Sequence, residues 1–210
     1  MASNIVLSST KGISLPSFTT TEKNAIVSPA TGAVVYDTTL NQESVYNGSA
    51  WVNVNTSGNS AITSGTAVAS TSGTSIDFTG IPSWVKRITV MFNGVSTNAT
   101  DNFLIQIGSG SVETSGYLSA ASSGTTISTS TAGFILTNVT SAGSAQYGNL
   151  VICNQTGNTW VESGTLSLAN ATALNVSAGS KLASGVIDRM RITTVAASTF
   201  DAGSINILYE

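Results

Sequence analysis

The feature that most constrains this chain is a recurrence of short β-branched and aromatic runs, each bounded by Gly, Asn, Ser or Pro. Such runs at this spacing are typical of the antiparallel strands of a β-sandwich. Residues 86 to 92, for example, form two alternating sets, Ile88, Val90 and Phe92 against Arg87, Thr89 and Met91. Alternation of period two predicts strands with one buried and one solvated face. We therefore expect an all-β chain whose body is an antiparallel, jelly-roll-like sandwich.

Strand signals run along the whole chain and leave little room for helices. The clearest strands are expected at residues 33–37, 44–46, 51–55, 86–92, 103–107, 134–139, 149–154, 159–162, 165–168, 186–195 and 203–209. No window carries the apolar stripe of an amphipathic helix. One short helix is expected at Thr20–Ala25, where Thr19 or Thr20 can cap a first turn that contains Glu22 and Lys23.

The low charge of the chain excludes several classes of partner. Charged residues make up 8% of the sequence, and the net charge of -3 arises from single, scattered residues. Without a basic patch, we expect no binding to nucleic acid or to anionic lipid. No apolar run approaches the length of a membrane span, so no membrane insertion is expected. The N-terminus lacks the pattern of a signal peptide, which favours synthesis in a cytoplasm.

A change in composition near residue 57 indicates the domain organisation. The segment from residue 56 to 75 contains neither aromatic nor charged residues, which is typical of a linker that leads into an edge strand. We expect an N-terminal module at residues 1–57, a Ser/Thr/Gly-rich linker and edge at 58–75, and a sandwich domain at 76–210. A β module of 57 residues buries little core alone, so it should need partners.

Few groups are available for catalysis or metal binding. The chain has no histidine and one cysteine, Cys153, which we expect to be buried because it follows the apolar residues 150–152. The carboxylates of the body stand on separate segments, and no nucleophile elbow of the form Gly-x-Ser-x-Gly occurs in a strand-to-helix context. We expect no enzymatic activity, no cofactor and no metal site.

Most of the basic charge of the expected body lies on two strands. Lys86 and Arg87 are on one, and Arg189 and Arg191 are on the other. Exposed charges of this kind usually form a solvated face or ion pairs between strands. The functional alternative is a subunit contact in which Arg87, Arg189 and Arg191 meet acidic residues of a neighbour. Trp84, at the turn before the first of these strands, is expected to pack in the core.

The N-terminal segment resembles a motif of phage tail-fibre and virion structural proteins. The resemblance rests on residues 12–26, 29–40 and 45–54, with the turn Tyr46-Asn47-Gly48-Ser49 and the return strand at Trp51. Asn-Gly supplies a positive φ at little cost, and Trp51 can pack across from Tyr36 or Tyr46. In that family the motif marks a short β module near an attachment end. Tyr36, Tyr46 and Trp51 are therefore the expected attachment or oligomer contacts.

Residues 72–210 resemble a domain that recurs in phage tail and virion proteins. The segment 76–97 and the C-terminal segment 200–210 carry this second resemblance. Together the two resemblances imply a homotrimeric fibre or spike subunit of a phage virion, made in the host bacterial cytoplasm, with its N-terminus docked on the particle. The alternatives are a capsid decoration protein and, less favoured, a glycan-degrading tailspike. The implied partners are neck, tail or capsid proteins and, for an adhesin, a host surface glycan.

Overall fold

The computed structural model describes residues 6–8, 12–54, 62–138, 140–169 and 173–210. The chain divides into two compact units, residues 1–61 and 62–210. Each unit is described by itself. Within the described residues the chain is almost entirely β, and all of its strand pairs but one are antiparallel, so the expected fold class is confirmed.

The N-terminal unit is built from short strands and one helical turn. A hairpin joins β1 (Val6–Ser8) to β2 (Gly12–Ser14). A four-stranded sheet has the order β3-β4-β5-β6 and consists of β3 (Ser17–Phe18), β4 (Val34–Asp37), β5 (Gln42–Tyr46) and β6 (Trp51–Asn53). Strand β3 pairs with β4 in parallel, which requires a crossover, and α1 lies in that connection.

Helix α1 (Thr20–Asn24) confirms the one helix that the sequence predicts. Thr19 is its N-cap, and the Thr19 hydroxyl accepts a hydrogen bond from the backbone N–H of Glu22 (3.3 Å). The Glu22 carboxylate in turn accepts one from the backbone N–H of Thr19 (2.8 Å). This reciprocal capping box satisfies two donors that a short helix would otherwise leave open.

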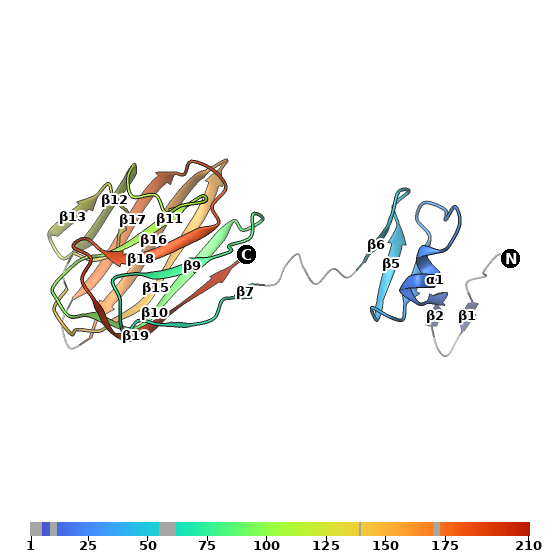
Figure 1. Ribbon diagram of the computed structural model, residues 1–210, viewed down its shortest axis with the longest axis horizontal. Coiled ribbons are helices and arrows are strands. Elements are labelled where there is room, and N and C mark those ends of the chain that lie inside the picture. The colour runs from blue at the N-terminus through green and yellow to red at the C-terminus, as the bar shows by residue number, and fades with distance from the viewer. Residues whose placement is uncertain (1–5, 9–11, 55–61, 139, 170–172) are drawn as a thin grey trace. The chain divides into compact units, whose positions relative to one another are not determined.

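The body is a sandwich of two sheets that face each other (Figure 1). The larger sheet has the order β13-β12-β17-β16-β15-β10-β19-β7, with β8 also paired to β19, and its strands are β7 (Thr63–Ser64), β8 (Val68–Ala69), β10 (Arg87–Thr97), β12 (Tyr117–Ser123), β13 (Thr126–Ser130), β15 (Gln146–Thr156), β16 (Thr159–Leu168), β17 (Leu174–Leu182) and β19 (Phe200–Tyr209). The smaller sheet has the order β14-β11-β18-β9, with β9 (Ile76–Thr79), β11 (Phe103–Gly108), β14 (Phe134–Ile135) and β18 (Arg189–Thr194).

The core lies between these two sheets. On β10 the set Ile88, Val90 and Phe92 is buried, as the alternation predicts. From the smaller sheet, Met190 and Ile192 pack into the same apolar cluster. Phe103 joins the two layers through ring contacts with Phe92 and Phe200, at centroid distances of 6.2 and 6.0 Å.

Several boundaries differ from those expected from the sequence. The separate strands at 159–162 and 165–168 are one strand, β16, and the strand at 134–139 is only Phe134–Ile135, with residue 139 outside the described part. Of the linker and edge segment, residues 58–61 also lie outside the described part, while β7 and β8 pair with β19.

Two single-residue predictions were wrong. Trp84 is 48% exposed and lies against Tyr209 at a centroid distance of 5.9 Å, because the turn that carries it leaves the sandwich before β10 begins. Cys153 is only partly buried, because its side chain alternates with the buried Leu150 and Ile152 and so belongs to the outer face of β15.

Candidate functional site

The N-terminal sheet presents one aliphatic face that the described part of its unit leaves uncovered. The register aligns Val34 on β4, Val45 on β5 and Val52 on β6 directly across from one another. Side chains of directly opposed residues point to the same side of a sheet, so the three valines form one row. Tyr36 and the exposed Glu43 oppose each other in the next row on the same side. Val34 and Val52 are exposed. We call Val34, Val45, Val52 and Tyr36 the valine face, and Glu43 stands at its edge.

The opposite side of this sheet carries a buried polar network instead of an apolar core. Lys23 of α1 forms an ion pair with Asp37 of β4, with Nζ 2.8 Å from Oδ2 and both side chains almost fully buried. Lys23 Nζ also donates to the hydroxyl of Ser44 (3.2 Å), which donates to the side-chain oxygen of Asn53 (3.0 Å). This network connects α1 to strands β4, β5 and β6.

The Asp37 carboxylate is held by several hydrogen bonds in addition to its ion pair with Lys23. Its carboxylate accepts hydrogen bonds from the Thr20 hydroxyl (2.8 Å) and from the backbone N–H groups of Thr39 and Leu40. Burial by itself raises the pKa of Asp37, but the hydrogen bonds from Lys23, Thr20 and Leu40 outweigh it and lower the pKa to about 2. Asp37 therefore stays ionised and paired at any pH above that value.

The same side of the sheet ends in an aromatic hollow. Tyr46 and Trp51 face each other across the β5–β6 hairpin with ring centroids 5.5 Å apart. The turn between them uses Gly48 at a φ of +98°, and the Asn47 side chain accepts hydrogen bonds from the N–H groups of Ser49 and Ala50. A hollow of about 510 Å³ adjoins the rings and is lined by Asn24, Ile26, Ser28, Pro29, Tyr46, Ser49, Ala50 and Trp51.

The structure thus separates the three residues expected at an attachment or oligomer contact. Tyr46 and Trp51 meet at the hollow, whereas Tyr36 lies on the valine face on the other side of the sheet. The sequence indicated the Tyr46–Trp51 pair through the Asn-Gly turn. It missed the valine face, because three single valines on three strands reveal a row only once the register is known.

The three arginines expected at a subunit contact do not gather on one face of the body. Arg87 lies on the outer face of the larger sheet, and Arg189 and Arg191 lie on the outer face of the smaller one. Each has an acidic partner within the chain: Glu210 for Arg87, Asp188 for Arg189 and Asp77 for Arg191. The Arg191–Asp77 contact is bidentate, at 2.7 and 2.9 Å, and joins directly opposed residues of β18 and β9. Their role between subunits stays a prediction.

The carboxylates of the body are engaged one by one with neighbouring groups. Asp101 accepts from Ser198, Glu113 forms an ion pair with Lys181, and Asp201 accepts from Ser96. Within the described residues, no group of three or more Asp, Glu or Cys side chains is placed to hold a metal ion.

Among the described acids of the body, Glu162 is the least exposed, and its side chain points into the sandwich. Ser177 donates to its Oε1 (2.7 Å), while Oε2 has no hydrogen-bond partner among the described residues. Burial raises the pKa of Glu162 to about 7, although the hydrogen bond from Ser177 opposes the rise.

Comparison with known proteins identifies a family at the N-terminus. Residues 2–73 match the family model described as a phage tail like trimerisation region. The resemblance of the N-terminal segment to phage tail-fibre-type proteins is thereby confirmed, and the match supports a homotrimer. No curated protein and no solved structure matches the chain. Within the described residues, no helix is long and apolar enough to cross a membrane.

Proposed function

We propose that this chain, a phage tail or fibre structural protein whose residues 2–73 match a trimerisation region, is a fibre or spike subunit that docks through its N-terminal unit and displays its sandwich. The observation that carries the proposal is the coincidence of that match with the valine face. An exposed apolar row with a charge only at its edge, here Glu43, is the kind of surface that association buries.

The two sides of the N-terminal sheet fit two separate roles. Three copies of the valine face can pack around a common axis, because the row Val34–Val45–Val52 contains no charge. The Tyr46–Trp51 hollow lies on the other side and combines exposed ring surface with hydroxyl and amide groups. Aromatic rings beside polar groups are frequent anchors of protein interfaces. We assign the valine face to the trimer and the hollow to another virion protein.

The body in this proposal is structural and has no catalytic role. Its described carboxylates are paired with Lys, Arg, Ser or backbone groups rather than with one another. A glycosidase needs two carboxyl groups about 5 to 9.5 Å apart with one of them free to take up or give a proton. The paired acids of the body do not favour that arrangement.

The proposal is tested with phage particles that carry single variants of this protein. Trp51→Ala removes one wall of the hollow and should strongly lower the amount of this protein that co-purifies with the particles, while the purified variant keeps the mass of a trimer. Trp84→Ala is the matched control, because Trp84 is a partly exposed tryptophan of the body. It should leave incorporation unchanged.

The opposite result would mean that the body, and not the N-terminal unit, attaches the protein to the particle. If Trp51→Ala is incorporated like the wild type while Trp84→Ala is lost from the particle, the body is the anchoring element. A copy number that follows the symmetry of the capsid would then favour a decoration protein. A small number of copies at the tail or neck would support the fibre assignment.

A further inference from the structure

The larger sheet of the body has an outer face that is aliphatic over its β13–β16 half. The residues of this face alternate with the buried ones, and the large hydrophobics among them are 39% to 75% exposed. They lie on four neighbouring strands: Ile127 on β13, Leu118 on β12, Leu174, Val176 and Leu182 on β17, and Val161 on β16. We call these six residues the aliphatic face.

Charge is missing from this half of the outer surface. The two charged residues within these four strands, Glu162 and Lys181, are buried and point to the other side of the sheet. Elsewhere the strands of the sandwich carry exposed or half-exposed charges, such as Asp77 and Arg191 on the smaller sheet. The hydroxyl groups of Ser122, Ser163 and Ser180 lie among the hydrophobic side chains. Six exposed large hydrophobic residues on four neighbouring strands, with no charge beside them, are nevertheless unusual on a monomer and mark a contact surface.

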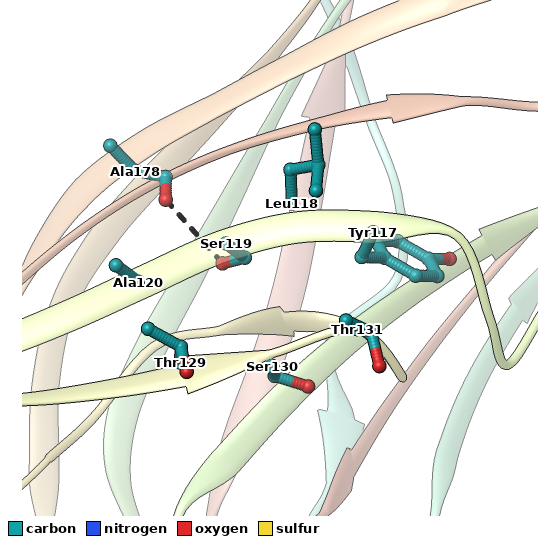
Figure 2. A pocket seen from close by; sticks show the side chains of 8 residues that line it. All are labelled: Tyr117, Leu118, Ser119, Ala120, Thr129, Ser130, Thr131 and Ala178. Atoms are coloured by element: carbon teal, nitrogen blue, oxygen red, sulfur yellow. Dashed lines mark hydrogen bonds between the residues drawn. The ribbon is translucent and has the colours of Figure 1, made fainter.

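The aliphatic face is uneven, because small and large hydrophobic side chains lie in separate rows. Ala120 of β12 and Ala178 of β17 oppose each other, and Thr129 of β13 lies beyond Ala120. They belong to the lining of a hollow of about 500 Å³ (Figure 2), whose other lining residues are Tyr117, Leu118, Ser119, Ser130 and Thr131. Leu118 stands in the row on one side of these three small side chains, and Val176 and Ile127 stand in the row on the other. A row of small side chains thus lies between larger aliphatic ones, and we call this row the groove and the larger side chains on its two sides the ridges.

A second copy of the chain fits this surface better than a charged partner does. Two uncharged faces can meet without like-charge repulsion and without leaving a buried ion unpaired. In a cyclic trimer each copy uses two different patches against its two neighbours, so a ridge of one copy can enter the groove of the next.

The trimerisation match also continues into this sheet. It runs to residue 73 and so includes β7 and β8, which pair with β19 of the same nine-stranded sheet. At about 4.8 Å per strand, β16 is roughly 15 Å from β19. Chains joined at their N-terminal units would hold their bodies at effective concentrations in the millimolar range, where even a weak contact is populated.

We propose that the aliphatic face is a second trimer interface, at which the sandwich bodies of neighbouring copies pack ridge into groove. The proposal rests on the homotrimer of the proposed function and adds a contact between the bodies to it. The bodies of one trimer then form a single cluster rather than three independent heads.

Cys153 supplies a built-in probe of this contact. It is the one cysteine of the chain, it is partly exposed, and it lies in a row across the sheet with Val161, Ser180 and Leu118. If a neighbouring copy covers this row, the thiol reacts slowly with Ellman's reagent. Full-length protein is used throughout, and light scattering records the mass of each variant.

Two kinds of change should uncover the thiol. The double variant Leu118→Asp/Val176→Asp places charge on both ridges, and Ala178→Gln fills the groove without adding charge. Each should raise the rate of thiol modification about tenfold or more, the factor that corresponds to 1.4 kcal/mol of contact free energy. Val186→Asp, at an exposed position outside the sheets, is the matched control and should leave the rate unchanged.

The masses measured by light scattering distinguish the proposed contact between bodies from the proposed N-terminal trimer. A trimer in which wild type and Ala178→Gln react at the same rate overturns the contact between bodies and leaves the N-terminal trimer intact. A wild-type chain with the mass of a monomer overturns both.

Discussion

The two units of this chain hold their folds together in opposite ways. Between residues 14 and 54 one hydrophobic side chain is buried, Val35, and the centre of the unit is the Lys23–Asp37 ion pair. The described part of the body buries twenty-nine hydrophobic side chains, twenty-five of them in one cluster. A buried ion pair adds little net stability, because desolvation offsets its attraction, whereas a large apolar core is the main source of folding free energy. The N-terminal unit therefore depends on association far more than the body does.

The first and largest test of this comparison removes Lys23, the buried cation of the Lys23–Asp37 ion pair. Lys23→Met leaves the Asp37 carboxylate buried without its ion pair, which costs about 3 to 5 kcal/mol when a buried pair loses one member. Because that unit has little apolar core, it should unfold and the trimer should dissociate. Calorimetry should still show the cooperative unfolding of the body. Lys86→Met, at an exposed lysine that contacts Asn154, is the control and should change neither transition.

The second test reverses the comparison by damaging the body. Leu150 lies on β15 in the middle of the larger sheet and is fully buried. Leu150→Ala should lower the stability of the body by about 2 to 5 kcal/mol, the usual cost of removing such a side chain from a packed core. The mass in light scattering should remain that of the wild type. Val195→Ala, at an exposed position, serves as the control. Loss of the trimer in Leu150→Ala alone would mean that the body, and not the N-terminal unit, holds the copies together.

The third and smallest effect is a pH dependence confined to the body. Glu162 has a pKa of about 7 in the folded chain, against an ordinary glutamate pKa of 4.5 in the unfolded chain. The folded form therefore keeps a proton that the unfolded chain has lost, so this stability is full below pH 4.5 and is lost as the pH rises through 7. At 1.36 kcal/mol per pKa unit the loss amounts to about 3 kcal/mol.

Glu162→Gln should remove this loss, because the amide is neutral at every pH. Its body should unfold at a higher temperature than the wild type at pH 8, and its melting temperature should fall less between pH 5 and 8. Glu43→Gln, an exposed acid of the N-terminal unit, is the matched variant and should keep the wild-type decline. An unchanged decline in Glu162→Gln would assign the pH dependence to another group.

The comparison also explains which parts of the fold the sequence could predict. Strands with β-branched residues on one face, such as β10, and the Thr19–Glu22 cap of α1 carry local signals that decide their structure. Strands β12 and β13 consist largely of Ser, Thr and Ala, and five of the nine residues of β17 are Asn, Ser, Ala or Gly. They therefore become strands through pairing with their neighbours rather than through propensity. They were missed for that reason.

The candidate sites differ in the same way, because a site within one hairpin could be predicted and a site spread over several strands could not. The Tyr46–Trp51 pair belongs to one hairpin and could be predicted from its turn. The valine face and the aliphatic face combine residues from three or four strands, and their existence depends on the register. The Lys23–Asp37 pair likewise joins a helix to a strand and has no signal in the sequence around either residue. The positions of Cys153 and Trp84 failed for a related reason, since an apolar neighbourhood in sequence does not decide which face of a strand or turn a side chain occupies.

The most direct test of the account is the mass of the full-length chain in light scattering, measured for the wild type and for Val45→Asp. A charge in the middle of the valine face would be buried between copies, while Val27→Asp, at a position 89% exposed, is the control. The account predicts about three times the chain mass of 21.3 kDa for the wild type and for Val27→Asp, and a single chain mass for Val45→Asp. A trimer that survives Val45→Asp would contradict the valine face as the contact, and a wild-type monomer at micromolar concentration would contradict the trimer itself.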